Sequence, residues 1–280
     1  MHKLRLTLAV LAIALMAVIV WKMWGTPDAA PPAEPAIGLT LPEDAAARTT
    51  TQLTPRQKLA ATRRLILRRI AEAPDYEAFF ARFQQSFPAA YTRTLAGFVD
   101  RAERLGRIES PDLYLAQALR SLRASHGVLA ARASPALLER IFELQSTFID
   151  VLSDADPKLC AGYLDGAASQ AFYEFAARRR KLVAAIAQAG LEAIIEGDAQ
   201  GVVREQVSLE DIGFIETQLR EHGLERPEID SLLDRVTPET PLADVTICRA
   251  AQVYYKVLRN APDELRMKVY AQMLQERARY

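Results

Sequence analysis

The sequence predicts an all-α protein in three parts: a cytoplasmic stub with a single transmembrane helix (residues 1–24), an Ala/Pro-rich linker (25–54) and a multi-helix globular body (55–280). Three observations support this prediction. An uncharged apolar run stands near the N-terminus, helix-start signals recur through the body, and runs of strictly alternating β-branched residues are missing. The chain has 280 residues, 50% hydrophobic and 25% charged, so it can bury a core and is not a disordered or collagen-like chain.

The apolar run over residues 4–24 predicts a membrane anchor. No charge lies between Leu6 and Trp21, and Lys22 can snorkel, so the span reaches the roughly 20 residues that a helix needs to cross a bilayer. The alternatives are a cleaved signal peptide and a buried helix. A cleavage site needs small residues directly after the run, whereas here bulky residues follow. We therefore expect an uncleaved anchor.

The flanking charges predict the orientation of this anchor. Lys3 and Arg5 precede it, while the charged residues over 25–54 are four acids and one arginine. The positive-inside rule therefore places the N-terminus in the cytoplasm and residues 25–280 across the membrane. The chain contains 28 Arg against 7 Lys and is rich in Ala and Pro, which favours a bacterial source with a GC-rich genome. We therefore expect a bacterial inner-membrane protein with a periplasmic body.

Residues 25–54 predict an extended, semi-flexible linker. They contain seven Ala, five Pro and no aromatic residue, a composition that cannot bury enough apolar surface to fold by itself. The body beyond it would thus be held near the membrane without being pressed against it.

Recurring helix-start signals predict nine to eleven helices packed as one body. A capping residue precedes proline four times, at Thr54-Pro55, Ser110-Pro111, Ser134-Pro135 and Asp156-Pro157. Gly106 and Gly223 are placed to end helices. The one ambiguous stretch is 197–207, where Val202-Val203 and Val207 allow a short strand. The aromatic residues at helical spacing, which favour core packing over a ligand groove, are Phe79, Phe80, Phe83, Phe87, Tyr254 and Tyr255.

Cys160 and Cys248 are the two cysteines of the chain. In an exported domain two lone thiols are more often bridged than free, so we expect a structural disulfide between them. The alternatives are two buried free thiols and, less favoured because no CxxC motif is present, a redox role.

No pattern in the sequence indicates catalysis, a metal or a cofactor. Walker, GxGxxG, GxSxG, HExxH and EF-hand motifs are absent, and histidine is too scarce for a multi-His zinc site. His126 shares a helical face with several leucines, which favours a core residue; the alternative is a pocket residue acting as a general base. We expect no cofactor, and the sequence favours a non-enzymatic role over an enzymatic one.

Two basic clusters stand out. Six positive charges mark the first helix of the body, at Arg56, Lys58, Arg63, Arg64, Arg68 and Arg69. This helix is expected either to form a solvated outer face, with its leucines and isoleucines turned inward, or to contact anionic lipid or an acidic partner. The second cluster, over 178–181, wraps around a helix and is interpreted as solvated charge.

Charge balance argues against nucleic acid as a partner. The chain has 35 basic and 35 acidic residues, and the part beyond residue 24 has 32 basic against 35 acidic, whereas nucleic-acid binders carry a basic excess. The plan of anchor, Ala/Pro-rich tether and helical body is similar to that of lipase-specific foldases. The sequence lacks their aromatic signature around an F-D-Y core, so the similarity assigns no residue a role.

The leading hypothesis is a single-pass inner-membrane protein whose periplasmic body binds another protein, in assembly, chaperoning or envelope organisation. The alternatives are an enzyme or small-ligand binder with a pocket between helices, and a binder of anionic lipid surfaces through the basic first helix.

Overall fold

The computed structural model describes residues 54–165, 169–233 and 240–279. In these residues all regular structure is helical, which confirms the all-α prediction. The elements are α3 (Pro55–Ala71), η1 (Pro74–Tyr76), α4 (Glu77–Ser86), α5 (Pro88–Leu105), α6 (Pro111–His126), η2 (Gly127–Arg132), α7 (Pro135–Ala155), α8 (Pro157–Leu164), α9 (Gln170–Ala177), α10 (Arg180–Gln200), α11 (Leu209–Glu221), α12 (Arg226–Leu233), α13 (Asp244–Asn260) and α14 (Asp263–Arg279).

The predicted transmembrane helix over residues 4–24 lies outside the described residues, as does the linker up to residue 53. Among the residues that the structure does describe, no helix is both long and apolar enough to cross a bilayer.

Most of the predicted helix starts carry the expected caps. Thr54 forms a capping box with Gln57, the Ser110 hydroxyl accepts from the backbone N–H of Leu113, and proline occupies the first turn of both helices. The described part of the chain contains twelve α-helices, more than the nine to eleven predicted. One of the breaks is at Pro88, which begins α5 directly after α4 because proline suits the first position of a helix.

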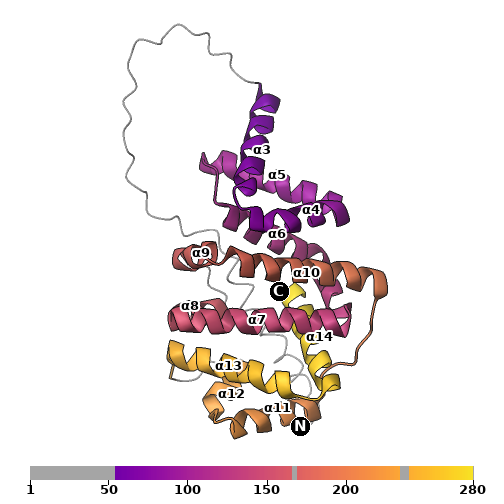
Figure 1. Cartoon of the computed structure of the whole chain (residues 1–280), viewed down its shortest axis with the longest axis vertical. Coiled ribbons are helices and arrows are strands. Elements are labelled where there is room, and N and C mark those ends of the chain that lie inside the picture. The colour runs from indigo at the N-terminus through magenta and orange to yellow at the C-terminus, as the bar shows by residue number, and fades with distance from the viewer. Residues whose placement is uncertain (1–53, 166–168, 234–239, 280) are drawn as a thin grey trace.

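The helices stack in layers along the long axis of the molecule (Figure 1). Helices α3 to α6 form one end, α10, α7 and α13 run across the middle, and α11 and α12 form the other end. A single apolar core runs through all layers and includes the aromatic groups expected there, with Phe79, Phe83 and Tyr254 fully or almost fully buried.

The short helix η2 lies between α10 and α14 at very close range. A Cβ on Gly197 of α10 would collide with the carbonyl of Leu129, and a Cβ on Gly127 would stand 2.7 Å from that of Ala278. Glycine at these positions lets the three helices touch backbone to backbone.

The possible strand over 197–207 is not present. Residues 197–200 complete α10, and residues 201–207 have no regular structure. The backbone N–H of Val202 donates to the carbonyl of Arg132, and the Arg204 guanidinium donates to the carbonyls of Ala131 and Ala133. This segment therefore packs on the end of η2, without the partner strand that a sheet requires.

The predicted disulfide between Cys160 and Cys248 is confirmed. It joins α8 to α13 with a Cα–Cα distance of 5.9 Å, within the ordinary range, and both residues are fully buried.

Candidate functional site

The basic helix α3 exposes all six of its positive charges. Arg56, Lys58, Arg63, Arg64, Arg68 and Arg69 are all exposed. Within the described residues, Arg69 alone among them forms an ion pair, with Glu72 one turn later at 2.6 Å. The other five guanidinium and ammonium groups therefore present uncompensated charge to solvent.

Three leucines of α3 are exposed as well, which differs from the expectation that the apolar residues of this helix turn inward. Ile66 and Ile70 are buried against the body, whereas Leu59, Leu65 and Leu67 are exposed. A helix turns about 100° per residue, so Leu65 and Leu67 point to opposite flanks and cannot both face one neighbouring surface.

Leu59 is exposed for a different reason. It follows the same stripe as Ile66 and Ile70, seven and eleven residues before them, but it is 45% exposed. Figure 1 shows that the first turns of α3 project beyond α4, α5 and α6. We refer to the exposed leucines and the six basic residues together as the α3 surface.

Three of the nine large apolar residues that are exposed in the described body lie on this one helix, among six cations. Apolar side chains that stay exposed beside charged ones are available to a binding partner. Arginine and leucine together suit a partner that offers carboxylates beside apolar side chains.

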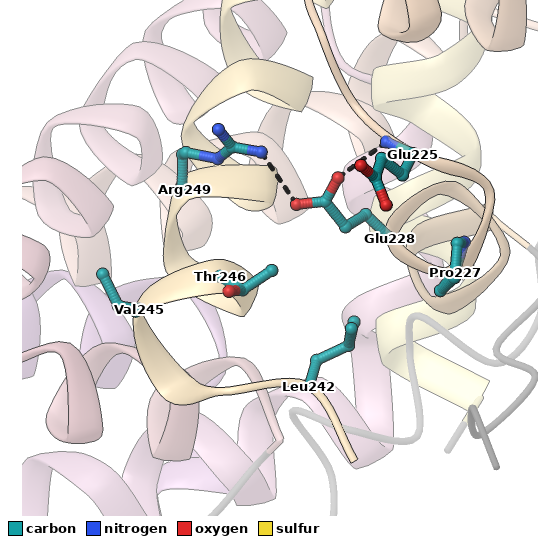
Figure 2. A pocket seen from close by; sticks show the side chains of 7 residues that line it. All are labelled: Glu225, Pro227, Glu228, Leu242, Val245, Thr246 and Arg249. Atoms are coloured by element: carbon teal, nitrogen blue, oxygen red, sulfur yellow. Dashed lines mark hydrogen bonds and ion pairs between the residues drawn. The ribbon is translucent and has the colours of Figure 1, made fainter. Parts of the chain in front are cut away.

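A second candidate site is a cavity of about 440 Å³ between α12 and α13 (Figure 2). It is lined by Glu225, Pro227, Glu228, Leu242, Val245, Thr246 and Arg249. The sequence did not predict this cavity. Its lining residues come from two separate segments, 225–228 and 242–249, and no helical spacing relates one segment to the other.

Two of the three charged side chains that line this cavity, Glu228 and Arg249, are bonded to each other. The buried Glu228 carboxylate accepts from the backbone N–H of Glu225 at 2.7 Å, which caps α12, and from the Arg249 guanidinium at 3.0 Å, which ties α12 to α13 (Figure 2). Thr246 is the one hydroxyl among the lining residues, and none of them is a histidine or lysine that would activate it.

His126, the predicted pocket residue, lies at the end of α6 and does not line this cavity. Its half-buried ring packs against Phe87, with ring centroids 4.4 Å apart, and its Nδ1 is 2.7 Å from the Ser125 hydroxyl. A pocket role for His126 stays a prediction.

Two buried polar clusters were missed by the sequence analysis. Asp112 accepts hydrogen bonds from Tyr76 and Arg180, and Glu109 accepts from Arg101 and Gln117. Burial raises the pKa of Asp112, but the hydrogen bonds from Arg180 and Tyr76 and the charge of Arg180 outweigh it and leave the pKa below its usual value. Both clusters join segments that lie apart in the sequence.

No group of three or more histidine, cysteine or acidic side chains in the described residues is placed to hold a metal ion. Comparisons with protein-family models, with curated proteins and with solved structures find no match to this chain. Functional inference therefore rests on the α3 surface and on the composition of the chain.

Proposed function

We propose that this chain is a single-pass inner-membrane protein whose periplasmic helical body binds another protein through the α3 surface. Residues 4–24 would form the anchor, residues 25–54 the tether, and α3 the first element of the body after the tether. The observation that carries the proposal is the joint exposure of Leu59, Leu65 and Leu67 with the basic residues of α3.

The shape of α3 favours a protein over a lipid surface. A helix that lies in the membrane interface buries one continuous apolar face. In α3 the continuous apolar face, with Ile66 and Ile70, is turned into the body. Leu65 and Leu67 lie on opposite flanks, with Arg64 and Arg68 between them. A flat bilayer can reach one flank at a time, whereas a protein with a groove or several helices can contact both.

The partner's chemistry follows from the α3 surface. Carboxylates on the partner would pair with the five unpaired cations of α3, and apolar side chains between those carboxylates would cover the exposed leucines. A binding role in assembly, chaperoning or envelope organisation fits this surface, because exposed cations and exposed leucines lie together on one projecting helix.

The test is photocrosslinking in intact membranes from the full-length protein. A photoreactive residue at Leu59 or Leu65 is expected to give a discrete protein adduct. The matched control is Val128, which is 44% exposed on η2, and which we expect to give little adduct. Adducts with lipid alone at Leu59 and Leu65, or equal yields at all three positions, would overturn the proposal.

A further inference from the structure

The first turn of α3 carries positive charge at the end of a helix that favours negative charge. Arg56 and Lys58 lie there, and the turn contains no acidic residue. The helix macrodipole places a partial positive charge at this end, so both cations are unfavourable and a carboxylate from elsewhere in the chain would stabilise the turn. Within the part of the chain that the structure describes, neither side chain forms an ion pair.

An exposed line of side chains runs along α3 from this turn. Arg56, Leu59, Arg63 and Leu67 are exposed and recur at spacings of three, four and four residues. They therefore share one side of the helix over about 16 Å. We refer to these four residues as the α3 flank. Its two leucines lie about 12 Å apart along the helix axis.

The chain holds a segment of complementary composition shortly before α3. Residues 37–44, which lie outside the described residues, have the sequence IGLTLPED, and we refer to them as the linker segment. Three large apolar residues stand at alternate positions, at Ile37, Leu39 and Leu41, and the carboxylates of Glu43 and Asp44 follow. The proline after Leu41 favours extended backbone at that residue, and alternate side chains of an extended chain point to the same side.

The spacing of the linker segment fits the α3 flank when the two run antiparallel. An extended chain advances about 3.3 Å per residue, so Ile37 and Leu41 would lie about 13 Å apart, close to the separation of Leu67 and Leu59. With those residues matched in pairs, Glu43 would lie about 7 Å beyond Leu41, at the first turn of α3. The carboxylates would thus meet the cations of that turn.

The connection between the two elements allows this arrangement. Residues 45–54 join the linker segment to the start of α3, and ten residues can span up to about 33 Å, which is ample for a reversal of the chain. A short tether of this kind gives the linker segment an effective concentration in the millimolar range at the α3 flank. A contact of modest affinity is therefore enough to occupy it.

We propose that the linker segment of this chain binds its own α3 flank and competes there with the partner protein. This inference rests on the proposed function, since it names what controls access to the same surface. The contacts expected are Leu41 with Leu59, Leu39 with the aliphatic stem of Arg63, Ile37 with Leu67, and Glu43 and Asp44 with Arg56 and Lys58. A partner must displace the linker segment before it can use both flanks of α3.

The experiment is photocrosslinking within the purified full-length protein in detergent, from a photoreactive residue at Leu41. Isotopically light and heavy protein are mixed in equal amounts before irradiation, and the crosslinked peptides are identified by mass spectrometry. The adduct is expected on α3 between Leu59 and Leu67. Both peptides of each adduct should come from the same isotope pool, as a contact within one chain requires.

Charge reversal tests the pairing of the carboxylates with the first turn of α3. Glu43→Lys/Asp44→Lys is expected to lower the yield of the α3 adduct about fivefold, because it places like charges side by side. Adding Arg56→Glu/Lys58→Glu to the same chain is expected to restore the yield, and acids in a first turn favour the helix, so α3 is retained.

The matched control is Asp28→Lys/Glu34→Lys, which makes the same charge change at two linker residues outside the linker segment. It is expected to leave the yield unchanged. An equal loss in this control, or no loss in Glu43→Lys/Asp44→Lys, would show that the linker segment does not recognise α3 by charge and would overturn the inference.

Competition is measured in intact membranes. Glu43→Lys/Asp44→Lys is expected to raise the partner-protein adducts from Leu59 and from Leu65, on the opposite flank, about threefold, since the α3 flank is no longer covered. Unchanged adducts would show that the linker segment and the partner do not compete.

The outcomes separate this inference from the proposed function. Leu41 adducts that join light to heavy peptides, or that avoid α3, would refute binding within one chain, yet a protein adduct at Leu65 would leave the proposed function standing. Adducts with lipid alone at Leu59 and Leu65 would defeat the proposed function and the competition with it, even where Leu41 labels α3.

Discussion

Arg180 binds Asp112 through two hydrogen bonds, from Nε to Oδ1 at 2.9 Å and from Nη2 to Oδ2 at 2.8 Å. Asp112 is buried in the first turn of α6 and Arg180 begins α10, so the pair joins two helices separated by 68 residues of sequence. The hydroxyl of Tyr76 donates to the same carboxylate at 2.7 Å and brings η1 into the contact. The Asp112 carboxylate thus accepts three hydrogen bonds, two from Arg180 and one from Tyr76.

Asp112→Asn is expected to lower the free energy of unfolding by about 3 kcal/mol, because it leaves the Arg180 guanidinium partly buried without its counter-charge. Urea unfolding of the full-length protein in detergent, followed by circular dichroism, measures this. Arg178→Gln is the matched control, since Arg178 is exposed, and a change within about 0.5 kcal/mol is expected there. Equal effects at the two positions would show that the buried pair contributes nothing.

The same pair predicts a pH dependence. The pKa of Asp112 is lowered in the folded protein, so the carboxylate stabilises the fold fully above its unfolded pKa of about 3.9, and this stabilisation is lost as the pH falls through the lower folded value. The difference in unfolding free energy between wild type and Asp112→Asn should therefore be constant from about pH 7 to pH 5 and shrink below about pH 4. A difference that grows toward low pH would contradict this sign.

Signals within a few residues of each other predicted much of the fold. Contacts between residues that are far apart in the sequence could not be predicted in this way. Thr54, Ser110 and Asp156 act on residues within three positions of themselves, so their caps could be predicted from neighbours alone. Arg180 lies in a run of four basic residues that we interpreted as solvated charge, and this interpretation is wrong for Arg180. Nothing within a helical turn of it indicates that its partner is Asp112.

The candidate site shows the same division. The charge of α3 was visible in the sequence, but the exposure of Leu59 was not, because it depends on where α4, α5 and α6 end in space. The exposure of Phe214 on α11 was likewise not visible in the sequence, because it depends on which face of α11 packs inward.

The disulfide between Cys160 and Cys248 closes a separation of 88 residues. Replacing both residues by alanine is expected to lower the free energy of unfolding by about 4 kcal/mol in the chain-entropy account. The measurement is urea unfolding with and without reductant. Wild type should lose stability on reduction and the double variant should not respond. Two thiols that react in unfolded, unreduced protein would show that the bond does not form.

Gly197 and Gly190 lie seven residues apart in α10 and provide the sharpest test of the packing around η2. A Cβ at Gly197 would collide with the carbonyl of Leu129, whereas a Cβ at Gly190 would meet nothing within 4 Å. Gly197→Ala is therefore expected to lower the free energy of unfolding by about 3 kcal/mol, because backbone cannot move aside as a flexible side chain can. Gly190→Ala is expected to raise it by about 0.5 to 1 kcal/mol, since alanine favours the helix. Urea unfolding of both variants compares the two, and a stabilising effect at Gly197 would mean that η2 does not approach α10 this closely.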